Sequence, residues 1–395
     1  MTWSSCDPPR PALSYGRTPT GNESKGATPL DPRGAPMTHG RAPTGGRWLA
    51  ERMRALILGG TAWLGAQLAR TALDRGGSVT CLARGSSGTA PPGVDLVRAD
   101  RTRPDAYDQV RDRDWDAVFD VARHPGQVRT AAEALRGRAG HYVFASSGNV
   151  YAHHRAPGQD ESTPLLDPLD NEVMETMAHY GPAKVACEQH VRRVLGPEHA
   201  LVARVGLIGG PGDPFDRSGY WPLRFARPAA ADGAVLVPDA PSLATQLIDV
   251  RDLAGWLVDA GARRLSGTYN VAGPTLTLAD HLKAARQVAG HTGPIVPVDQ
   301  RWLTDQGVQP WMGERSLPLW LDDPDWLGFN ARDTGAAQVA GLVNRPLTET
   351  LADTLEWELT RDPGRARLAG LTAADERELL EAWRGRKPTT SSPGS

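Results

Sequence analysis

Residues 54–65 read Arg54-Ala-Leu-Ile-Leu-Gly-Gly-Thr-Ala-Trp-Leu-Gly65, and the expected fold follows from this stretch. Its apolar run predicts a buried strand, and the glycines behind it predict a tight turn into a helix. Gly59 permits the turn, Gly65 lets helix and strand approach, and Ala62 stands where a middle glycine is frequent. In a βαβ unit, the first amides of such a helix can receive a pyrophosphate group, although a purely structural turn is the alternative. We therefore predict a dinucleotide-binding turn made of Gly59, Gly60, Thr61, Ala62, Trp63, Leu64 and Gly65.

The following residues repeat this alternation of short apolar runs and longer segments of helical period. The pattern is typical of βαβ units around a parallel sheet with helices on both faces. We predict an α/β fold: a Rossmann-type doubly wound parallel sheet with a smaller C-terminal substrate-binding lobe. The predicted strands are 54–58, 78–83, 95–98, 117–121, 142–145 and 200–204, and the predicted helices are 63–73, 127–135 and 180–195.

The regular alternation of predicted strands and helices ends after Val205, where Gly, Pro, Trp and Phe become frequent. A chain of 395 residues exceeds the length that one hydrophobic core usually serves, so two lobes are expected. We assign residues 53–205 to the NAD(P)-binding Rossmann domain, with residues 244–262 returning to it. The substrate-binding lobe is predicted to consist of residues 206–243 and 263–385.

The two ends of the chain have a different composition. The first 52 residues are dense in Pro, Gly, Ser, Thr and Arg and lack apolar periodicity. Such a segment cannot bury enough surface to offset the entropy of ordering. We predict that residues 1–52 form a disordered N-terminal extension and that residues 386–395 form a flexible tail.

Charge and cysteine content narrow the class of protein. A net charge of −2, from 44 basic and 46 acidic side chains, gives no broad positive field, so no nucleic-acid partner is expected. The three cysteines are predicted to be free thiols in a reducing compartment, and no metal-ligand spacing is present. No apolar run approaches the roughly 18 residues of a membrane span, and the apolar core of a secretory signal is missing. We expect a cytoplasmic protein with no membrane association.

The end of the second predicted strand bears on the choice of cofactor. An NAD enzyme usually has an acidic side chain here for the ribose hydroxyls, but the sequence offers Arg84, Ser86 and Ser87. A cation and two hydroxyls suit a 2′-phosphate, so NADP is favoured over NAD, although Arg84 is also compatible with solvated surface. Asp100, after the third strand, is a candidate acceptor of a hydrogen bond from the adenine amino group. The alternative is that Asp100 is a turn residue or a helix N-cap.

Tyr180 and Lys184 form the central catalytic prediction. In Tyr180-Gly-Pro-Ala-Lys184 a phenol and an ammonium lie four residues apart, and therefore on the same face of a helix. A nearby ammonium stabilises a phenolate, which makes Tyr180 a usable general acid or base near neutrality. Only four of the 44 basic residues are lysines, so a chance surface pair is a poor explanation of this spacing.

Ser147 is the third catalytic prediction. The run Tyr142-Val-Phe-Ala-Ser-Ser147 reads as a buried strand that ends in two hydroxyls, at the sheet edge where α/β proteins present catalytic groups. Ser147 would bind the substrate oxygen together with Tyr180 while a hydride passes to or from the carbon that carries it. An ordinary turn is the alternative interpretation.

These motifs, in this order, resemble those of the extended short-chain dehydrogenases/reductases, the NAD-dependent epimerase/dehydratase family. The resemblance covers residues 53 to about 280 and includes Arg204-Val-Gly-Leu-Ile-Gly-Gly-Pro-Gly-Asp213, Gln246-Leu-Ile-Asp-Val-Arg-Asp252 and Gly267-Thr-Tyr-Asn-Val-Ala-Gly273. It implies hydride transfer at a hydroxyl or carbonyl carbon of a small molecule such as a sugar nucleotide. It also implies a possible homodimer that pairs through the helix with the Tyr-Lys motif.

The departures from the family pattern leave alternatives open. The glycine turn resembles the atypical Gly-Gly-Thr-x-Phe-x-Gly variants, and Gly148-Asn149 replaces the Thr-Asp-Glu of sugar-nucleotide 4,6-dehydratases. Dehydratase chemistry would therefore lack its usual acid and base, whereas oxidation, reduction and epimerisation stay open. A non-catalytic RNA-binding or cofactor-sensing protein on the same fold is the rival hypothesis.

Several other side chains have two interpretations. Arg217, Arg224 and Arg227 are candidates for a diphosphate clamp, but an arginine-rich composition makes solvated arginines the default. The tryptophans between Trp302 and Trp326 are able to stack on a sugar ring, but packing in the core of a small lobe is the favoured role.

Overall fold

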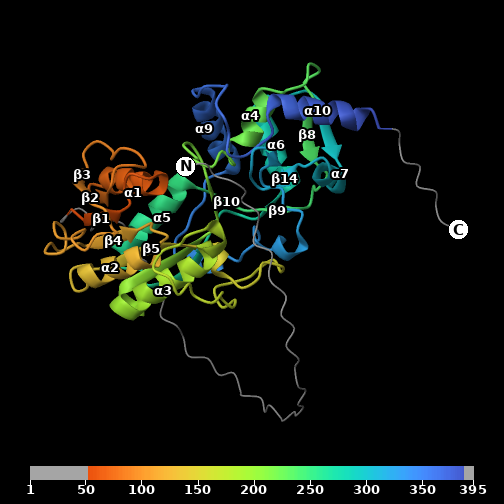
Figure 1. The fold of residues 1–395 in the computed structure, drawn as a ribbon. Helices are drawn as coiled ribbons and strands as arrows, with labels where there is room; N and C mark the ends of the chain where they lie inside the picture. Colours follow the sequence, from red (N-terminus) through yellow and green to blue (C-terminus); the bar gives the residue numbers. More distant parts are fainter. Residues whose placement is uncertain (1–51, 387–395) are drawn as a thin grey trace, which may run out of the picture. The chain divides into compact units, whose positions relative to one another are not determined.

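The computed structural model describes residues 52–386, and of these residues 53–386 fall in one compact unit. Its centre is a seven-stranded parallel sheet with the strand order β11-β6-β5-β4-β1-β2-β3 (Figure 1). The expected extension and tail, apart from Arg52 and Arg386, lie outside the described residues. The strands of the sheet are β1 Arg54–Leu58, β2 Ser78–Ala83, β3 Asp95–Arg98, β4 Ala117–Asp120, β5 Tyr142–Ser147, β6 Ala200–Val205 and β11 Gly267–Val271.

Helices cover both faces of this sheet, so the doubly wound fold predicted from the sequence is confirmed (Figure 1). Because side chains alternate along a strand, β1 sends Ala55 and Ile57 to one face and Leu56 and Leu58 to the other. The first face packs against α1 (Trp63–Asp74) and α5 (Val250–Ala262). The second packs against α2 (Pro125–Leu135) and α3 (Tyr180–Leu195).

The seventh strand corrects the expected division of the chain. Residues 263–385 are expected in the second lobe, but β11 pairs with β6 and forms an edge of the central sheet. Its first three residues, Gly267 to Tyr269, are exposed or only half-buried, because an edge strand has one unpaired side. The apolar run that marks a buried parallel strand is therefore missing from the sequence.

The second lobe has a core of its own. β8 (Val235–Pro238) pairs in parallel with β13 (Ile295–Val298), and Trp221 and Trp320 are fully buried beside them. Core packing is thus confirmed for Trp320. The helices of this lobe are α4 Tyr220–Ala226, α6 Leu278–Val288, α7 Gln300–Asp305, α9 Leu347–Leu359 and α10 Ala373–Arg384.

Short elements complete the described chain. Within residues 52–386, no helix is long and apolar enough to cross a lipid bilayer. Besides four 3₁₀ turns, the described chain contains β7 Leu207–Gly209, which pairs with β10 Leu247–Asp249; β9 Ala244–Thr245, which pairs with β12 Leu276–Thr277; β14 Gln309–Pro310, which pairs with β15 Ser316–Leu317; and α8 Gly335–Val339.

A buried ion pair lies at the end of β4. Both guanidinium nitrogens Nη1 and Nη2 of Arg101 donate to the carboxylate of Asp120, at 2.8 and 2.7 Å. The Tyr142 hydroxyl of β5 donates to the same carboxylate at 2.7 Å, and the Asp120 side chain is fully buried. Burial opposes ionisation of Asp120, but the charge and hydrogen bonds of Arg101 hold its pKa below the usual range. The pair therefore ties the carboxyl end of β4 to Tyr142, the first residue of β5.

Candidate active site

The glycine turn lies between β1 and α1, as predicted. The Gly59 amide donates to the carbonyl oxygen of Leu82 in β2 at 2.9 Å, and Gly59 has a φ of 96°, a region that favours glycine. A Cβ added at Gly60 would meet Cys81 Sγ at 2.1 Å, and one at Gly65 would meet the Gly59 carbonyl oxygen at 2.2 Å. These positions accept only glycine without a shift of the backbone or of a buried side chain.

Gly65 gives a first testable prediction. We expect Gly65→Ala to destabilise the protein by about 1–3 kcal/mol, because the added methyl group overlaps backbone atoms that cannot move away. Gly255→Ala is the matched control, since Gly255 also lies inside a helix but its added Cβ would approach only Arg75 Nη2, at 3.5 Å. That control should gain about 0.5–1 kcal/mol from helix propensity. Urea unfolding of both variants measures the difference, and equal midpoints would show that the turn tolerates a side chain.

The remaining residues of the turn open the helix. Thr61 is buried, Ala62 occupies the N-cap of α1, and Leu64 packs against the core on the α5 side of the sheet. Because α1 begins at Trp63, its first amides have no partner within the helix and are available to an anion. The Trp63 side chain has a different role: its Nε1 donates to the Pro211 carbonyl oxygen at 2.9 Å and ties the turn to the segment after β7.

Arg84 and Asp100 lie at the neighbouring strand ends. Arg84 is exposed directly after β2, and it contributes to the electrostatic environment of Asp100. Asp100 Oδ1 accepts hydrogen bonds from the Thr102 amide at 3.0 Å and from its hydroxyl at 2.8 Å, and these bonds lower the pKa of Asp100. Asp100 therefore forms a side-chain turn, the alternative noted for it, and a role toward adenine stays a prediction.

Lys184 is held at the carboxyl edge of the sheet. Its Nζ donates to the carbonyl oxygens of Ala122, at 2.8 Å, and Ala145, at 2.6 Å, which follow β4 and lie in β5. Only 3% of the residue is exposed, and Nζ lies 4.7 Å from the centre of the Phe144 ring. Tyr180 begins α3, and the centre of its ring lies 6.0 Å from Nζ. The ammonium is therefore fixed by backbone atoms, one helical turn after the phenol.

Ser147 ends β5 and starts a short 3₁₀ turn. Its hydroxyl donates to Asn149 Oδ1 at 3.0 Å and accepts from the Asn149 amide at 3.2 Å. Because Lys184 binds Ala145 of the same strand, the serine and the ammonium belong to one strand end. The structure thus brings Ser147, Lys184 and Tyr180 to the end of β5.

A buried network that sequence reasoning missed supports this edge. Ser146 Oγ donates to Glu188 Oε1 at 2.6 Å, and Arg204 of β6 donates to both oxygens of Glu188. Glu188 lies four residues after Lys184, on the same face of α3. A carboxylate at this spacing and an arginine inside a buried strand were signals that could have revealed the pair.

Arg332 is a second residue that sequence reasoning missed. It is 4% exposed, its Nη2 donates to the Gly148 carbonyl oxygen at 2.8 Å, and its guanidinium carbon lies 4.5 Å from the centre of the Tyr151 ring. The same Nη2 lies 2.9 Å from Nδ1 of His154. Burial lowers the pKa of His154 to about 3, so this imidazole is neutral near pH 7. A distant segment of the chain thereby packs directly behind Ser147.

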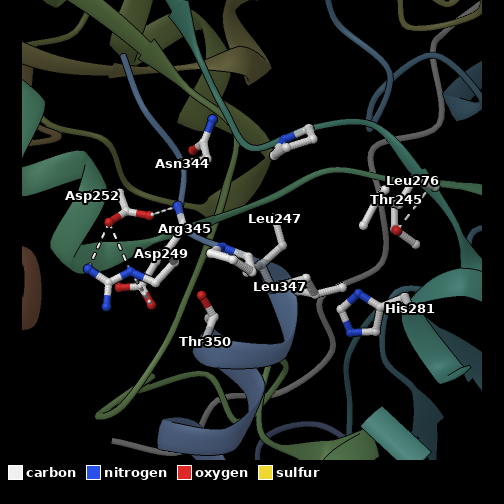
Figure 2. Close-up of a pocket in the computed structure, with 12 residues that line it drawn as sticks. Thr245, Leu247, Asp249, Asp252, Leu276, His281, Asn344, Arg345, Leu347 and Thr350 are labelled. Carbon is white, nitrogen blue, oxygen red and sulfur yellow. Dashed lines mark hydrogen bonds and ion pairs between the residues drawn. The ribbon is translucent and has the colours of Figure 1, made fainter. Parts of the chain in front are cut away.

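A cavity of about 300 Å³ lies apart from these residues, and none of the three predicted catalytic residues lines it (Figure 2). Figure 2 shows Asp249, Asp252 and Arg345 grouped at one end and His281 at the other. Arg345 is ion-paired with Asp252 at 2.8 Å, and burial lowers the pKa of His281 to about 4. The charges at one end of the cavity are thus paired, and the imidazole at the other end is neutral near pH 7. Within residues 52–386, no group of three His, Cys, Asp or Glu side chains is placed to hold a metal ion.

Comparison with protein families identifies the family of this chain. The model of the NAD dependent epimerase/dehydratase family matches residues 55–272, which include the glycine turn, Ser147, Tyr180 and Lys184. A 2'-dehydrokanamycin reductase from Streptomyces kanamyceticus is 32% identical over 199 residues. That alignment covers 48% of this chain and 53% of the reductase, so the chain matches only about half of the length of its relative.

Solved structures share the fold. A candidate epimerase from Burkholderia cenocepacia J2315 superposes with a TM-score of 0.58 at 22% identity, over 77% of this chain and 97% of its own. The UDP-glucose 4-epimerase of Thermus thermophilus, in complex with NAD, superposes with a TM-score of 0.54 at 18% identity, over 78% and 100% of the two chains. At these identities the likeness supports the Rossmann-type architecture and leaves the reaction open.

Proposed function

Because the chain belongs to the NAD-dependent epimerase/dehydratase family, we propose that it transfers a hydride between a nicotinamide dinucleotide and a hydroxyl or carbonyl carbon. The substrate is a small molecule. One observation carries this proposal: Lys184 is fixed by the Ala122 and Ala145 carbonyl oxygens at the end of the central strands, one helical turn after Tyr180. A buried ammonium at this sheet edge is the arrangement that a phenol needs to exchange protons.

The residues of the glycine turn fit a dinucleotide. Gly59, Gly60 and Gly65 let the turn, β2 and the start of α1 pack so closely that a Cβ would overlap protein atoms, and the first amides of α1 have no partner within the helix and are available to an anion. These residues would hold the pyrophosphate. When bound, the nicotinamide supplies or accepts the hydride, and the protein provides orientation and proton transfer.

The catalytic side chains act on the substrate oxygen. In the direction of reduction, the Tyr180 hydroxyl gives its proton to the oxygen of the carbon that accepts the hydride; in oxidation it takes this proton back. Ser147 holds the same oxygen by exchanging its bond to Asn149 Oδ1 for one to the substrate. Lys184 keeps its two carbonyl partners throughout and stabilises the tyrosine when it is deprotonated.

The substrate that we propose is sugar-like, as in a sugar nucleotide. The names of the Thermus epimerase and of the Streptomyces reductase support this class, since one names a UDP-glucose and the other a dehydro derivative of kanamycin. We also propose a cytoplasmic homodimer without a nucleic-acid partner. The buried free thiols of Cys81 and Cys187 support a reducing compartment, and the near-neutral net charge supports the absence of a nucleic-acid partner. The dimer rests on the family resemblance.

Single-turnover absorbance of reduced nicotinamide tests the reaction. The protein is mixed with sugar nucleotides or small ketones, with and without added cofactor. A reductase consumes one reduced cofactor per turnover, whereas an epimerase retains its cofactor and shows only a transient absorbance change. Absence of any hydride transfer across the panel, together with RNA affinity that falls with salt, would favour the RNA-binding alternative.

The preference for NADP is a prediction of its own. We expect a higher kcat/KM with NADPH than with NADH, because Arg84 stands exposed at the end of β2 where it can bind a 2′-phosphate. Arg84→Ala should reduce kcat/KM for NADPH by about 10-fold and leave the value for NADH nearly unchanged. Steady-state kinetics with both cofactors measure this. An equal effect on the two cofactors would contradict the assignment of Arg84.

A further inference from the structure

Like Arg332 and Arg286, Arg217 is at least partly buried without a carboxylate partner, but those two donate to backbone carbonyl oxygens. The Arg217 guanidinium donates no hydrogen bond to the described residues. Within residues 52–386 it forms no ion pair, and its Nε is buried without a hydrogen-bond partner. Burial lowers the pKa of Arg217, while the nearby Asp213 and Tyr180 act in the opposite direction. By contrast, carboxylates neutralise six other arginines that are buried or partly buried: Arg101 pairs with Asp120, Arg204 with Glu188, Arg224 with Glu376, Arg251 with Asp249, Arg345 with Asp252 and Arg365 with Asp216.

Two aromatic rings hold the Arg217 guanidinium. Its central carbon lies 4.9 Å from the centre of the Phe215 ring and 5.3 Å from that of the Trp311 ring. Ring faces attract a cation and restrict its rotation, but they accept no conventional hydrogen bonds from its N–H groups. The guanidinium is therefore oriented, while its donors lack acceptors.

The backbone is strained at both sides of this stack. Asp216, directly before Arg217, has a φ of 61°, and Trp311 has a φ of 70°. These left-handed conformations are costly for residues other than glycine, above all for a bulky one such as Trp311. Two strained residues thus place one arginine against one tryptophan.

Neighbouring groups enforce the strained conformations. The Asp216 carboxylate binds Arg361 at 3.1 Å and Arg365 at 2.6 Å, and it accepts from the Leu368 amide at 2.9 Å. The Trp311 amide donates to the carbonyl oxygens of two residues, Leu317 at 3.2 Å and Trp320 at 3.0 Å. A fold that maintains this strain around an unpaired cation indicates a use for the cation.

Asp213 is a carboxylate near Arg217, but its oxygens are already engaged. They accept from the amides of Phe215, Arg217 and Ser218 at 2.9 to 3.1 Å and from the Ser218 hydroxyl at 2.9 Å. Asp213 therefore shapes the turn and leaves the Arg217 side chain without a hydrogen-bonded counter-ion.

The turn that carries Arg217 also belongs to the site. It continues from the segment that Trp63 of the glycine turn binds through the Pro211 carbonyl oxygen. At its other end, Tyr180 is an electrostatic neighbour of Arg217. The turn that carries Arg217 is thus connected directly to the dinucleotide turn.

We propose that Arg217, laid against Trp311 and Phe215, binds an oxyanion group of the substrate, a carboxylate or a phosphate, and so determines substrate specificity. The planar fork of a guanidinium matches both groups by two parallel hydrogen bonds. The flat Trp311 ring and the exposed Phe215 ring supply apolar contact beside the charge. This inference rests on the proposed function and names the chemical class of its substrate.

Calorimetric titration tests the inference without turnover. The protein is first saturated with oxidised cofactor, so that a nucleotide probe does not occupy the dinucleotide turn. UDP is compared with uridine for the phosphate arm, and D-glucuronate with methyl glucoside for the carboxylate arm. We expect one anion to bind and its neutral counterpart to bind at least 10-fold more weakly.

Variants then assign the binding to Arg217. Arg217→Gln should lower the affinity for the anion by about 10- to 100-fold. Arg217→Lys keeps the charge but loses the two parallel donors of the guanidinium, so it should retain part of the affinity. Arg227→Gln is the matched control, because Arg227 is exposed at the end of α4, and its affinity should equal that of the parent. Failure of both anions to bind, or unchanged affinity in Arg217→Gln, would overturn the proposal.

A stability measurement separates recognition from a structural role. Removal of an unpaired, partly buried cation should leave the melting temperature of the free protein unchanged or raise it, whereas a structural arginine would lower it on removal. Cofactor titration is recorded separately for each variant. If the cofactor does not bind the parent, the proposed function fails; if it binds but Arg217→Gln keeps anion affinity, only the present inference fails.

Discussion

Tyr180→Phe is expected to reduce kcat by about 10²- to 10⁴-fold, the range that a positioned general acid or base contributes. The substitution removes the one oxygen of this side chain that exchanges a proton with the substrate, and it keeps the ring that lies 6.0 Å from Lys184 Nζ. Steady-state absorbance of reduced nicotinamide gives kcat, and fluorescence titration gives cofactor affinity. The affinity should change little, because the dinucleotide contacts come from the turn after β1.

Tyr269→Phe is the matched control for this loss. The Tyr269 hydroxyl donates to the Ser266 carbonyl oxygen at 3.0 Å on the edge strand β11, away from Ser147 and Lys184. Its removal should leave kcat unchanged. A Tyr180→Phe protein that turns over as fast as this control would refute the role of the phenol and, with it, the hydride-transfer proposal.

Asp120→Ala is expected to destabilise the protein by about 3–5 kcal/mol, the usual cost of removing one partner of a buried ion pair. The substitution leaves the Arg101 guanidinium, which is almost fully buried, without its carboxylate. It also deprives the Tyr142 hydroxyl of its acceptor. Urea unfolding at neutral pH measures the change, and the loss should appear as a lower midpoint with a similar slope.

The dependence of this effect on pH follows from the direction of the pKa shift. The folded-state pKa of Asp120 is depressed, so its stabilisation is complete above the unfolded pKa, near 3.9, and is lost as pH falls through the folded value. The difference between parent and Asp120→Ala should therefore shrink below about pH 4. Asp114→Ala, which removes an exposed pair with Arg138, should stay close to the parent at every pH. A constant difference for Asp120→Ala would contradict the role of its ionised form.

The central fold could be predicted because its signals are local. The six predicted strands are all present within a residue or two, and α3 occupies its predicted range of 180–195. α2 begins two residues before its predicted start, at Pro125, because proline is tolerated in the first turn of a helix. β11 escaped prediction because an edge strand needs no apolar run, and its pairing with β6 joins residues far apart in the chain.

The site could be predicted only in part. Tyr180 and Lys184 share a helix, so their proximity follows from spacing, and Ser147 ends a strand that the sequence marks clearly. Arg332 lies 184 residues from Gly148, whose carbonyl oxygen it binds, and no spacing rule connects them. Arg217 was indistinguishable from a solvated arginine until its lack of an ion pair and its two aromatic neighbours became visible. Contacts made only by tertiary packing carry no periodic signal in the sequence.

One hydrogen bond, from the Trp63 indole to the Pro211 carbonyl oxygen, has a mechanical consequence. It joins the glycine turn, where we propose that the cofactor binds, to the segment that carries Arg217, where we propose that the substrate binds. A displacement of one segment would therefore move the other. Thermodynamic reciprocity then requires that whatever the first ligand does to the affinity for the second, the second does equally to the affinity for the first. Through this hydrogen bond, the two ligands would change each other's affinity by the same factor, whichever of them binds first.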